Sequence, residues 1–316
     1  YAFEAGIRAI QAHYDRCGID AEVSAEQLNG IYRSKYRLKE QPLVSVIIPN
    51  KDHTEDLDKC IRSIEEKGTY KNIEYIVIEN NSQKKETFAY YEKLQAENPK
   101  VKVVFWEREF NYSAINNYGV GFAKGEYLLF LNNDTEIINP DCIEELLGYC
   151  MRDDVGIVGA RLYYEDDTIQ HVGVIIGLGG VAGHTFVGEP KDSLGYFGRI
   201  VTAQDYSAVT AACLMTKRKV FEKVNGFEEK LAVAFNDVDF CLKVREAGYL
   251  VVYNPYAELH HYESKSRGLE DTEEKVLRFQ GEIRTFQYRW KEILNEGDPY
   301  YSPNLTLDKT DFSLRI

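Results

Sequence analysis

The pattern of apolar and polar positions along residues 43–131 alternates between two periods. Continuous apolar runs, typical of strands buried on both faces of a parallel sheet, occupy residues 43–48, 73–78, 101–106 and 127–131. Between them, apolar residues spaced three and four apart predict helices over residues 56–67, 86–97 and 113–124. We expect Ser113 to cap the last of these helices. Strand–helix alternation at this spacing predicts βαβ units, and therefore an α/β fold with a mainly parallel, Rossmann-like sheet flanked by helices.

The segments on either side of this region follow other patterns. Residues 2–16 carry apolar side chains at helical spacing, which predicts a short N-terminal helix, and residues 17–40 are polar and mixed, as in a linker or the tail of an upstream domain. Beyond about residue 155 we expect strands over residues 157–160, 172–176, 208–215 and 250–253, and helices over residues 217–224, 238–247 and 272–293. We expect these elements to complete the same sheet and wrap it, without forming a separate domain.

The composition narrows the class of protein. The chain has 38 basic and 51 acidic residues, and its net charge of −13 repels nucleic-acid phosphates and anionic lipids, so neither is an expected non-specific partner. Its longest apolar stretch, residues 172–183, is glycine-rich and shorter than the roughly 20 residues that span a bilayer. Six scattered cysteines without a C-x-x-C pair fit buried thiols in a reducing compartment, so the cytosol is the expected location. The chain opens without a secretory signal pattern and begins with Tyr1, which suggests a piece of a longer protein.

Polar side chains that could bind a metal follow the strand predicted over residues 127–131. Asn132, Asn133 and Asp134 come directly after this buried run, at the edge of the sheet where ligands bind in α/β folds. Oxygen ligands grouped in this way suit Mg²⁺ or Mn²⁺ bridging to a phosphate. The alternative is an ordinary turn, because Asn and Asp are also common turn residues.

Two further clusters have both a catalytic and a structural interpretation. Asp237 opens a predicted helix, where it could act on a ligand or only complement the helix dipole. His260 and His261 follow the strand predicted over residues 250–253, and one of them could ligate a metal. A buried, hydrogen-bonded histidine is the commoner alternative.

In this order, the motifs resemble those of the family 2 inverting glycosyltransferases, which have the GT-A fold and use nucleotide-sugar donors. Residues 44–52 and 76–82 resemble the nucleotide-binding half of that family, and residues 111–119 and 125–134 resemble its approach to the metal motif. Residues 226–229, 236–242 and 261–264 resemble its acceptor and catalytic half. The resemblance covers roughly residues 43–267 and is greatest to modules of bacterial rhamnan and O-antigen polysaccharide-assembly enzymes.

The resemblance implies a role for each residue that matches a family motif. Asp237 matches the general base, Asp134 the last acid of the Asp-x-Asp metal motif, and His261 a further metal ligand. Asn132 stands where the first acid of that motif usually stands, so it is a weaker ligand. The donor-binding residues implied are Pro49, Asn50, Asp52, Glu79, Asn81, Asn116, Asn133 and Arg267, with Glu79 at the position that contacts the base.

We therefore expect a metal-dependent inverting glycosyltransferase that uses Mn²⁺ or Mg²⁺. It would transfer a hexose from a UDP- or dTDP-linked donor to a growing cell-surface polysaccharide or glycolipid, a glycan or lipid-linked glycan acceptor. Residues 1–40 would be a helical connector from an upstream module, and the transferase domain would take residues 41–316. Within that domain we expect a nucleotide-binding half at residues 41–135, an acceptor and catalytic half at residues 136–268, and a helix at residues 270–294.

The expected partners and location follow from the same resemblance. Neighbouring transferase modules of the same polypeptide are expected, and the site of action would be the cytoplasm, at the inner face of the cell membrane if other parts of the protein reach it. One rival hypothesis is a catalytically inactive sugar- or nucleotide-binding module, which the neutral Asn132 favours. A dinucleotide-binding oxidoreductase is the other, but Pro49 and Asn50, and not G-x-G-x-x-G, follow the first strand.

Overall fold

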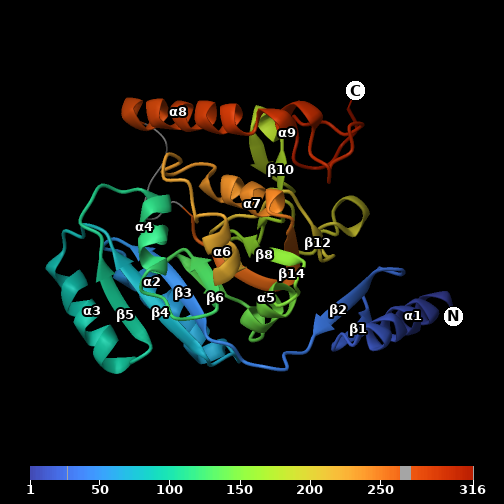
Figure 1. Ribbon diagram of the computed structural model, residues 1–316, viewed down its shortest axis with the longest axis horizontal. Coiled ribbons are helices and arrows are strands. Elements are labelled where there is room, and N and C mark those ends of the chain that lie inside the picture. Colours follow the sequence, from blue (N-terminus) through green and yellow to red (C-terminus); the bar gives the residue numbers. More distant parts are fainter. Residues whose placement is uncertain (27, 264–271, 316) are drawn as a thin grey trace.

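The computed structural model describes residues 1–26, 28–263 and 272–315 and is built around one large sheet (Figure 1). Its strands run in the order β12-β14-β8-β13-β6-β3-β4-β5, with β7 paired to β14 and β9 to β8. Strand pairs β3–β4, β3–β6, β4–β5 and β8–β14 are parallel, whereas β13 runs antiparallel to both of its neighbours. The mainly parallel sheet expected from the apolar runs is therefore confirmed. The strands are β3 (Val44–Asn50), β4 (Ile73–Glu79), β5 (Val101–Phe105), β6 (Tyr127–Leu131), β7 (Thr135–Ile137), β8 (Val155–Tyr163), β9 (Ile169–His171), β12 (Gln204–Asp205), β13 (Cys213–Lys217) and β14 (Leu250–His261).

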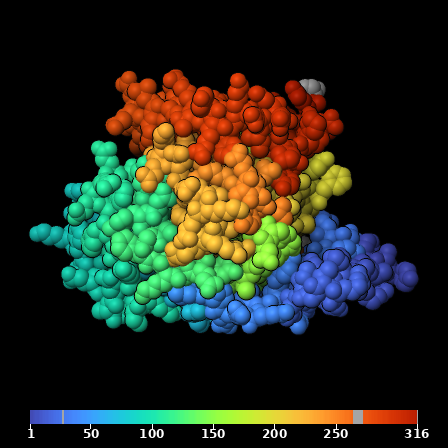
Figure 2. All heavy atoms as spheres, viewed as in Figure 1, coloured from blue at the N-terminus to red at the C-terminus, as the bar shows by residue number. Residues whose placement is uncertain are grey.

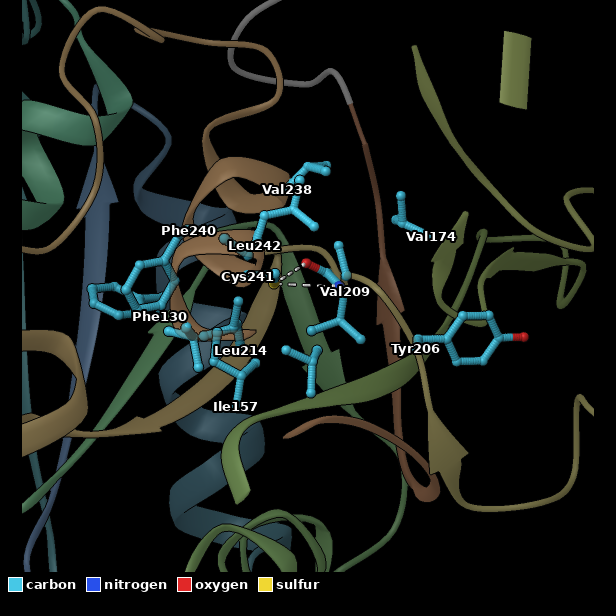
Figure 3. Packing of buried hydrophobic residues seen from close by; sticks show 14 of the residues in the cluster. Phe130, Ile157, Val174, Tyr206, Val209, Leu214, Val238, Phe240, Cys241 and Leu242 are labelled. Atoms are coloured by element: carbon cyan, nitrogen blue, oxygen red, sulfur yellow. Dashed lines mark hydrogen bonds between the residues drawn. The ribbon is translucent and has the colours of Figure 1, made fainter. Parts of the chain in front are cut away.

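Helices cover both faces of this sheet, and this explains why the strand sequences are apolar without alternation. Ile47 and Phe130 face one hydrophobic layer, which includes side chains of α4, α6, α7 and α8, while Ile48 and Leu129 face a second layer formed with α2, α3 and α5. Figure 3 shows the first layer around Phe130, where Phe240 of α7 packs against the sheet. The helices are α2 (Thr54–Arg62), α3 (Lys85–Glu97), α4 (Tyr112–Val120), α5 (Cys142–Cys150), α6 (Arg218–Lys223), α7 (Asn236–Glu246), α8 (Glu273–Arg289) and α9 (Lys291–Glu296).

Local details differ from the sequence-based expectations at several points. Asn111, and not Ser113, caps α4: its side chain accepts a hydrogen bond from the backbone N–H of Ala114, while the Ser113 hydroxyl donates to the carbonyl of Leu231. The long C-terminal helix is broken at Trp290 into α8 and α9. Helix α5 and the short strands β7, β9 and β12 were not expected. The hairpin β10 (Val174–Ile176) and β11 (Ala182–His184) lies outside the main sheet.

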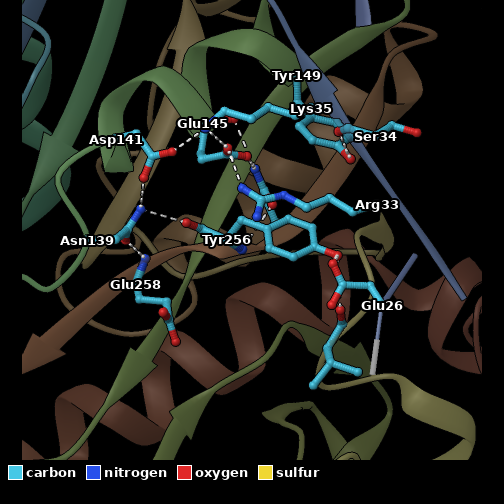
Figure 4. Close-up of polar contacts among 12 residues, drawn as sticks. Glu26, Arg33, Ser34, Lys35, Asn139, Asp141, Glu145, Tyr149, Tyr256 and Glu258 are labelled. Carbon is cyan, nitrogen blue, oxygen red and sulfur yellow. Dashed lines mark hydrogen bonds and ion pairs between the residues drawn. The ribbon is translucent and has the colours of Figure 1, made fainter. Parts of the chain in front are cut away.

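The N-terminal segment contains more structure than the linker expected there. Helix α1 (Ala2–Cys17) is followed by β1 (Ala21–Ala25) and β2 (Tyr32–Tyr36), which pair with each other as an antiparallel hairpin. The basic side chains of β2 meet acidic side chains near α5, as Figure 4 shows. In the space-filling view this hairpin and the C-terminal residues lie at opposite sides of the molecule (Figure 2). None of the helices in the described parts of the chain is long and apolar enough to cross a membrane.

Candidate functional site

A cavity of about 630 Å³ opens where β3 and β6 end, at the carboxyl edge of the parallel part of the sheet. One wall comes from the end of β3 (Pro49, Asn50 and Lys51) and from the loop after β6 (Asn132, Asn133 and Asp134). Residues of the loop before β13 and of the start of α7 form another wall, which includes Asp237. The cavity therefore brings together residues from all three polar clusters found in the sequence.

Strand pairing places His261 beside the loop that carries Asp134. Strand β14 pairs with β7 so that His261 lies opposite Thr135, and the backbone N–H of Tyr262 donates to the carbonyl of Asp134 at 2.9 Å. His261 Nε2 then lies 3.3 Å from Asp134 Oδ1 and 3.1 Å from the side-chain nitrogen of Asn132. The motif resemblance favours His261 over the adjacent His260, and in the structure the two side chains point to opposite faces, as neighbouring strand residues do. His260 turns the other way and contacts Asp167 at 2.9 Å.

A buried glutamine determines which nitrogen of His261 carries the proton. The side-chain nitrogen of Gln170 donates to the carbonyl of His261 and to the carboxylate of Glu263, both at 3.2 Å. Its oxygen therefore faces His261 Nδ1, at 2.7 Å, so that Nδ1 is the donor. Nε2 is then the ring nitrogen that faces Asp134 and Asn132, as in the histidine ligands of metal sites.

These side chains fit a divalent cation, for which the protein would supply only part of the coordination shell. The residues described do not include a group of three or more His, Cys, Asp or Glu side chains that could hold a metal ion. The site instead offers one carboxylate from Asp134, one imidazole lone pair from His261 and the amide of Asn132. A rotation of that amide by half a turn would present its oxygen in place of its nitrogen. Such a set leaves coordination positions open for water or the oxygens of a ligand.

Asp237 stands at the N-terminus of α7 and faces the same cavity. Its carboxylate accepts hydrogen bonds from the backbone N–H groups of Ala211, at 3.1 Å, and Val238, at 2.8 Å. Burial, followed by the nearby carboxylates of Asp237 and Asp134, raises the pKa of the Tyr112 phenol. Tyr112 also lines the cavity, so it lies close to both acids.

Asp239, two residues further along α7, occupies a different environment. Its side chain is fully buried and accepts a hydrogen bond from Trp290 Nε1 at 2.9 Å, and Arg289 Nε lies 3.1 Å away. Burial raises the pKa of this carboxyl, although the Trp290 bond opposes the effect. Asp239 is absent from the described lining of the cavity. It anchors the C-terminal helices to α7.

Three of the predicted donor-binding residues line the cavity, namely Pro49, Asn50 and Asn133. The Asn133 amide donates to Asn50 Oδ1 at 2.6 Å, the Asn50 amide donates to the Tyr91 hydroxyl at 2.7 Å, and this hydroxyl donates to Glu79 at 2.6 Å. Each of these side chains is almost completely buried. The chain of hydrogen bonds fixes the cavity floor to the core behind β3 and β4.

The other predicted donor-binding residues are not among the described residues that line the cavity. Asp52 accepts bonds from the backbone N–H groups of Gln83 and Lys84 before α3, Glu79 holds Ser82 and Tyr91, the Asn81 amide donates to the carbonyl of Arg108, and the Asn116 amide donates to the carbonyl of Tyr112. Their side chains serve the fold in this conformation, so their contact with a donor stays a prediction. Arg267 lies outside the described residues.

Sequence reasoning missed several residues that line the cavity. Gln170 lies on a strand of only three residues, His184 is the last residue of β11, and Thr210 lies in the loop before β13. None of them follows a run that was predicted as a strand, so no pattern marked them. Only the register of β7 against β14 shows that His261 lies beside Asp134.

The chain is similar in sequence to known proteins. The sequence profile described as Glycosyl transferase family 2 matches residues 45–224, more than half of the chain, and leaves Asp237 and His261 beyond its end. A protein of Sinorhizobium fredii is 46% identical, and an O-antigen biosynthesis protein of Myxococcus xanthus 37% identical, each over 99% of this chain. The chain spans 35% and 24% of the lengths of these two relatives.

The fold is also similar to that of a solved transferase. A mannosyltransferase from Pyrobaculum calidifontis, described in complex with GDP-Man and Mn²⁺, superposes with a TM-score of 0.57 at 16% sequence identity. The superposition covers 81% of this chain and 69% of the mannosyltransferase. This likeness confirms the GT-A fold that the sequence predicted.

Proposed function

Because the chain belongs to glycosyl transferase family 2, we propose that its cavity transfers a hexose from a nucleotide-sugar donor with inversion and with the help of a divalent cation. The observation that carries this proposal is the convergence of Asp134, His261 and Asp237 on one cavity from three distant parts of the sequence. A carboxylate and an imidazole lone pair suit the diphosphate side of the donor, and a second carboxylate suits the attacking hydroxyl.

On the donor side, the residues at the end of β3 would hold the nucleotide. Pro49, Asn50 and Lys51 line the cavity beside Asn133, and the ammonium group of Lys51 adds positive charge where a diphosphate would lie. Mn²⁺ or Mg²⁺, when bound, would neutralise charge on the leaving diphosphate. Asp134 and His261 would hold that cation, and Asn132 would contribute a neutral oxygen. A uridine or thymidine base is the one that the sequence motifs favour.

On the acceptor side, Asp237 would act as the general base. Inverting transfer requires the attacking hydroxyl to lose its proton on the face of the sugar opposite the leaving group, and a carboxylate within hydrogen-bond reach can accept it. The backbone N–H groups of Ala211 and Val238 hold this carboxylate at the N-terminus of α7, where it faces the cavity. In this position it would be available to a bound acceptor hydroxyl.

The Myxococcus xanthus relative, which is named for O-antigen biosynthesis, supports a polysaccharide or lipid-linked glycan as the acceptor. This chain spans about a quarter of that relative, so neighbouring transferase modules on the same polypeptide are part of the proposal. Synthesis from nucleotide sugars would place the reaction in the cytoplasm, with other parts of the protein bringing it to the membrane.

Replacement of Asp237 by Asn tests the proposed function most directly. The amide cannot accept the proton as a carboxylate does, so Asp237→Asn should lower kcat by about 10²–10⁴-fold in a turnover assay with the donor that the wild-type protein uses. Donor affinity, measured by isothermal titration with Mn²⁺, should change little, because the diphosphate is held by other residues.

The matched control is Asp239→Asn, on the same helix. Since Asp239 is buried against Trp290 and Arg289, this variant should lose stability and keep the kcat of the folded fraction. Near-normal turnover by Asp237→Asn would rule out the base assignment.

A catalytically inactive binding module is the second candidate, because Asn132 replaces an acid of the metal motif. That candidate predicts Mn²⁺-dependent binding of a nucleotide sugar without transfer or hydrolysis. A panel of UDP-, dTDP- and GDP-sugars, screened first by thermal shift and then by release of the nucleoside diphosphate, separates the two functions.

A further inference from the structure

The loop that precedes α7 forms part of one wall of the cavity, and α4 contacts this loop from one side. Val233, Ala234 and Phe235 line the cavity and lead directly into the helix that begins with Asn236 and Asp237. On the side of α4, the backbone N–H of Tyr112 donates to the carbonyl of Ala232 at 2.7 Å, and the Ser113 hydroxyl donates to Leu231 at 2.6 Å. These contacts hold the carbonyl groups of the loop.

A carboxylate from a distant helix holds the N–H groups of the same loop. Glu282 of α8 is 3% exposed, and its two oxygens accept hydrogen bonds from the backbone N–H of Val233, at 2.8 Å, and of Ala234, at 3.2 Å. A buried carboxylate is costly unless hydrogen bonds or opposite charges compensate it. Arg278 Nε lies 3.7 Å from one of its oxygens, and the two backbone N–H groups supply the hydrogen bonds that the buried carboxylate requires.

Aromatic packing brings α8 to the same loop. Phe235 adopts a left-handed backbone conformation, with φ of 59°, and its ring packs against Phe279 at 5.8 Å and Phe286 at 5.4 Å between centroids. In Figure 1, α8 lies at the top of the molecule, above α7. The turn that aims the first residues of α7 is therefore fixed by contacts with a helix about 50 residues further along the chain.

We propose that Glu282 is a positioning residue for the transfer reaction, because its bonds to Val233 and Ala234 determine where Asp237 stands in the cavity. This inference rests on the proposed function, in which Asp237 removes the proton of the acceptor. A displacement of about 1 Å in a catalytic group can cost on the order of 10²-fold in rate, so a bond that fixes the loop affects turnover without touching the substrate.

The test compares Glu282→Gln with Glu274→Gln, an exposed position on the same helix. Glutamine keeps the size of the side chain, but its NH₂ group would face one of the two N–H donors of the loop. Glu282→Gln should lower kcat by about 10–100-fold, while the donor affinity measured by titration should change less than about twofold. Glu274→Gln should match the wild type in both quantities.

A double-mutant cycle distinguishes positioning from a general loss of structure. If Glu282 acts through Asp237, the double variant should be about as slow as Asp237→Asn alone, whereas independent effects would multiply. An unchanged kcat in folded Glu282→Gln, or multiplying losses, would overturn the inference. Normal turnover of Asp237→Asn alone would instead overturn the proposed base, so the two failures are distinguishable.

Hydrogen exchange keeps the inference testable if Glu282→Gln does not fold. In the wild-type protein, the amides of Val233 and Ala234 should exchange more slowly than exposed loop amides, and Glu282→Met, which removes both acceptors while filling the space, should speed their exchange and lower kcat. Rapid exchange of both amides in the wild type would contradict the proposed contact.

Discussion

Strand β14 contributes to two polar networks with different designs. Near its middle the strand has a register shift between Asn254 and Glu258, and within it the Tyr256 hydroxyl donates to Glu26 of the N-terminal segment at 3.0 Å. There Glu145, whose side chain is 2% exposed, lies 2.7 Å from Arg33, and the guanidinium stacks 4.0 Å from the ring of Tyr256 (Figure 4). This network matches buried negative charge with fixed positive charge.

The second network lies at the end of the strand, around His261. Here the carboxylate of Asp134 lies beside His261, whose Nδ1 donates to Gln170, so that Nε2 is the nitrogen that faces the carboxylate. The first network pairs its charges within the protein, as structural ion pairs do. The second brings the side chains of Asp134 and His261 together at the cavity, as ligand sites do. We therefore expect substitutions in the first to change stability and substitutions in the second to change binding.

The largest effect is expected for Asp134→Ala. Removing the only carboxylate among the proposed ligands should weaken Mn²⁺-dependent binding of a nucleoside diphosphate by at least about 100-fold, more than the loss of an outer partner. The measurement is calorimetric titration of nucleotide with and without Mn²⁺. Asp141→Ala, which removes a carboxylate from the Glu145 network, is the control and should leave that affinity unchanged. Equal metal dependence in both variants would contradict the assignment of Asp134.

A smaller effect is expected for Gln170→Met, which removes the acceptor for His261 Nδ1 and nearly preserves the size of the side chain. Partners of metal-binding histidines contribute about 10–100-fold to affinity, so Mn²⁺ binding should weaken by about that factor. Gln170→Glu should restore only part of the affinity, because its carboxylate also accepts from Nδ1 but repels Glu263. The control is Gln204→Met, since Gln204 donates to backbone carbonyls in another loop. Unchanged Mn²⁺ affinity in Gln170→Met would show that the tautomer does not matter.

These two networks also show how far sequence reasoning reaches. The sheet could be predicted because strands buried on both faces must be apolar throughout, and Asp134 could be found because it follows such a strand. The motif residues Asp237 and His261 could be proposed by resemblance. Their meeting with Asp134 depends on the β7–β14 register and on the loop before β13, neither of which has a sequence period.

There is a physical reason why the rest of the site could not be predicted. Gln170 and Glu282 act through hydrogen bonds to residues about 90 and 50 positions away, and no local pattern records such a pair. The hairpin at residues 21–36 was missed because its strands carry charged side chains, which suit a surface docked by ion pairs and lack the apolar alternation of a core strand. The motif position of Asp52 predicts a donor contact, because it does not reveal that the side chain accepts hydrogen bonds from the backbone before α3.

Arg33→Met is the next test of the comparison, on the structural side. In this variant Glu145 stays buried, and Lys35, 3.5 Å away, is its remaining ion-pair partner in Figure 4. The free energy of unfolding should therefore fall by about 1–3 kcal/mol. The kcat of the folded protein should not change. Arg37→Met, directly after the same hairpin, breaks an exposed pair with Glu22 and should cost less than about 1 kcal/mol. Denaturant unfolding of both variants checks the order, and equal losses would mean that the buried pair is no stronger than the exposed one.

The smallest effect is expected at Asp52, which the sequence assigned to the donor and the geometry assigns to the fold. Burial would raise the pKa of Asp52, but bonds from the backbone N–H groups of Gln83 and Lys84 and from the Thr87 hydroxyl outweigh it and lower the pKa below its usual 3.8. A folded-state pKa below the unfolded value stabilises the protein at pH values above the unfolded pKa, and this contribution is lost as the pH falls through the folded pKa.

Asp52→Ala should therefore cost about 1 kcal/mol at pH 7, as for the loss of a helix cap, and progressively less below about pH 4. Asp52→Asn, which can still accept a hydrogen bond, should cost less than Asp52→Ala, and the exposed control Asp192→Ala should cost least. Loss of donor affinity without loss of stability in Asp52→Ala would instead return this residue to the ligand-binding group.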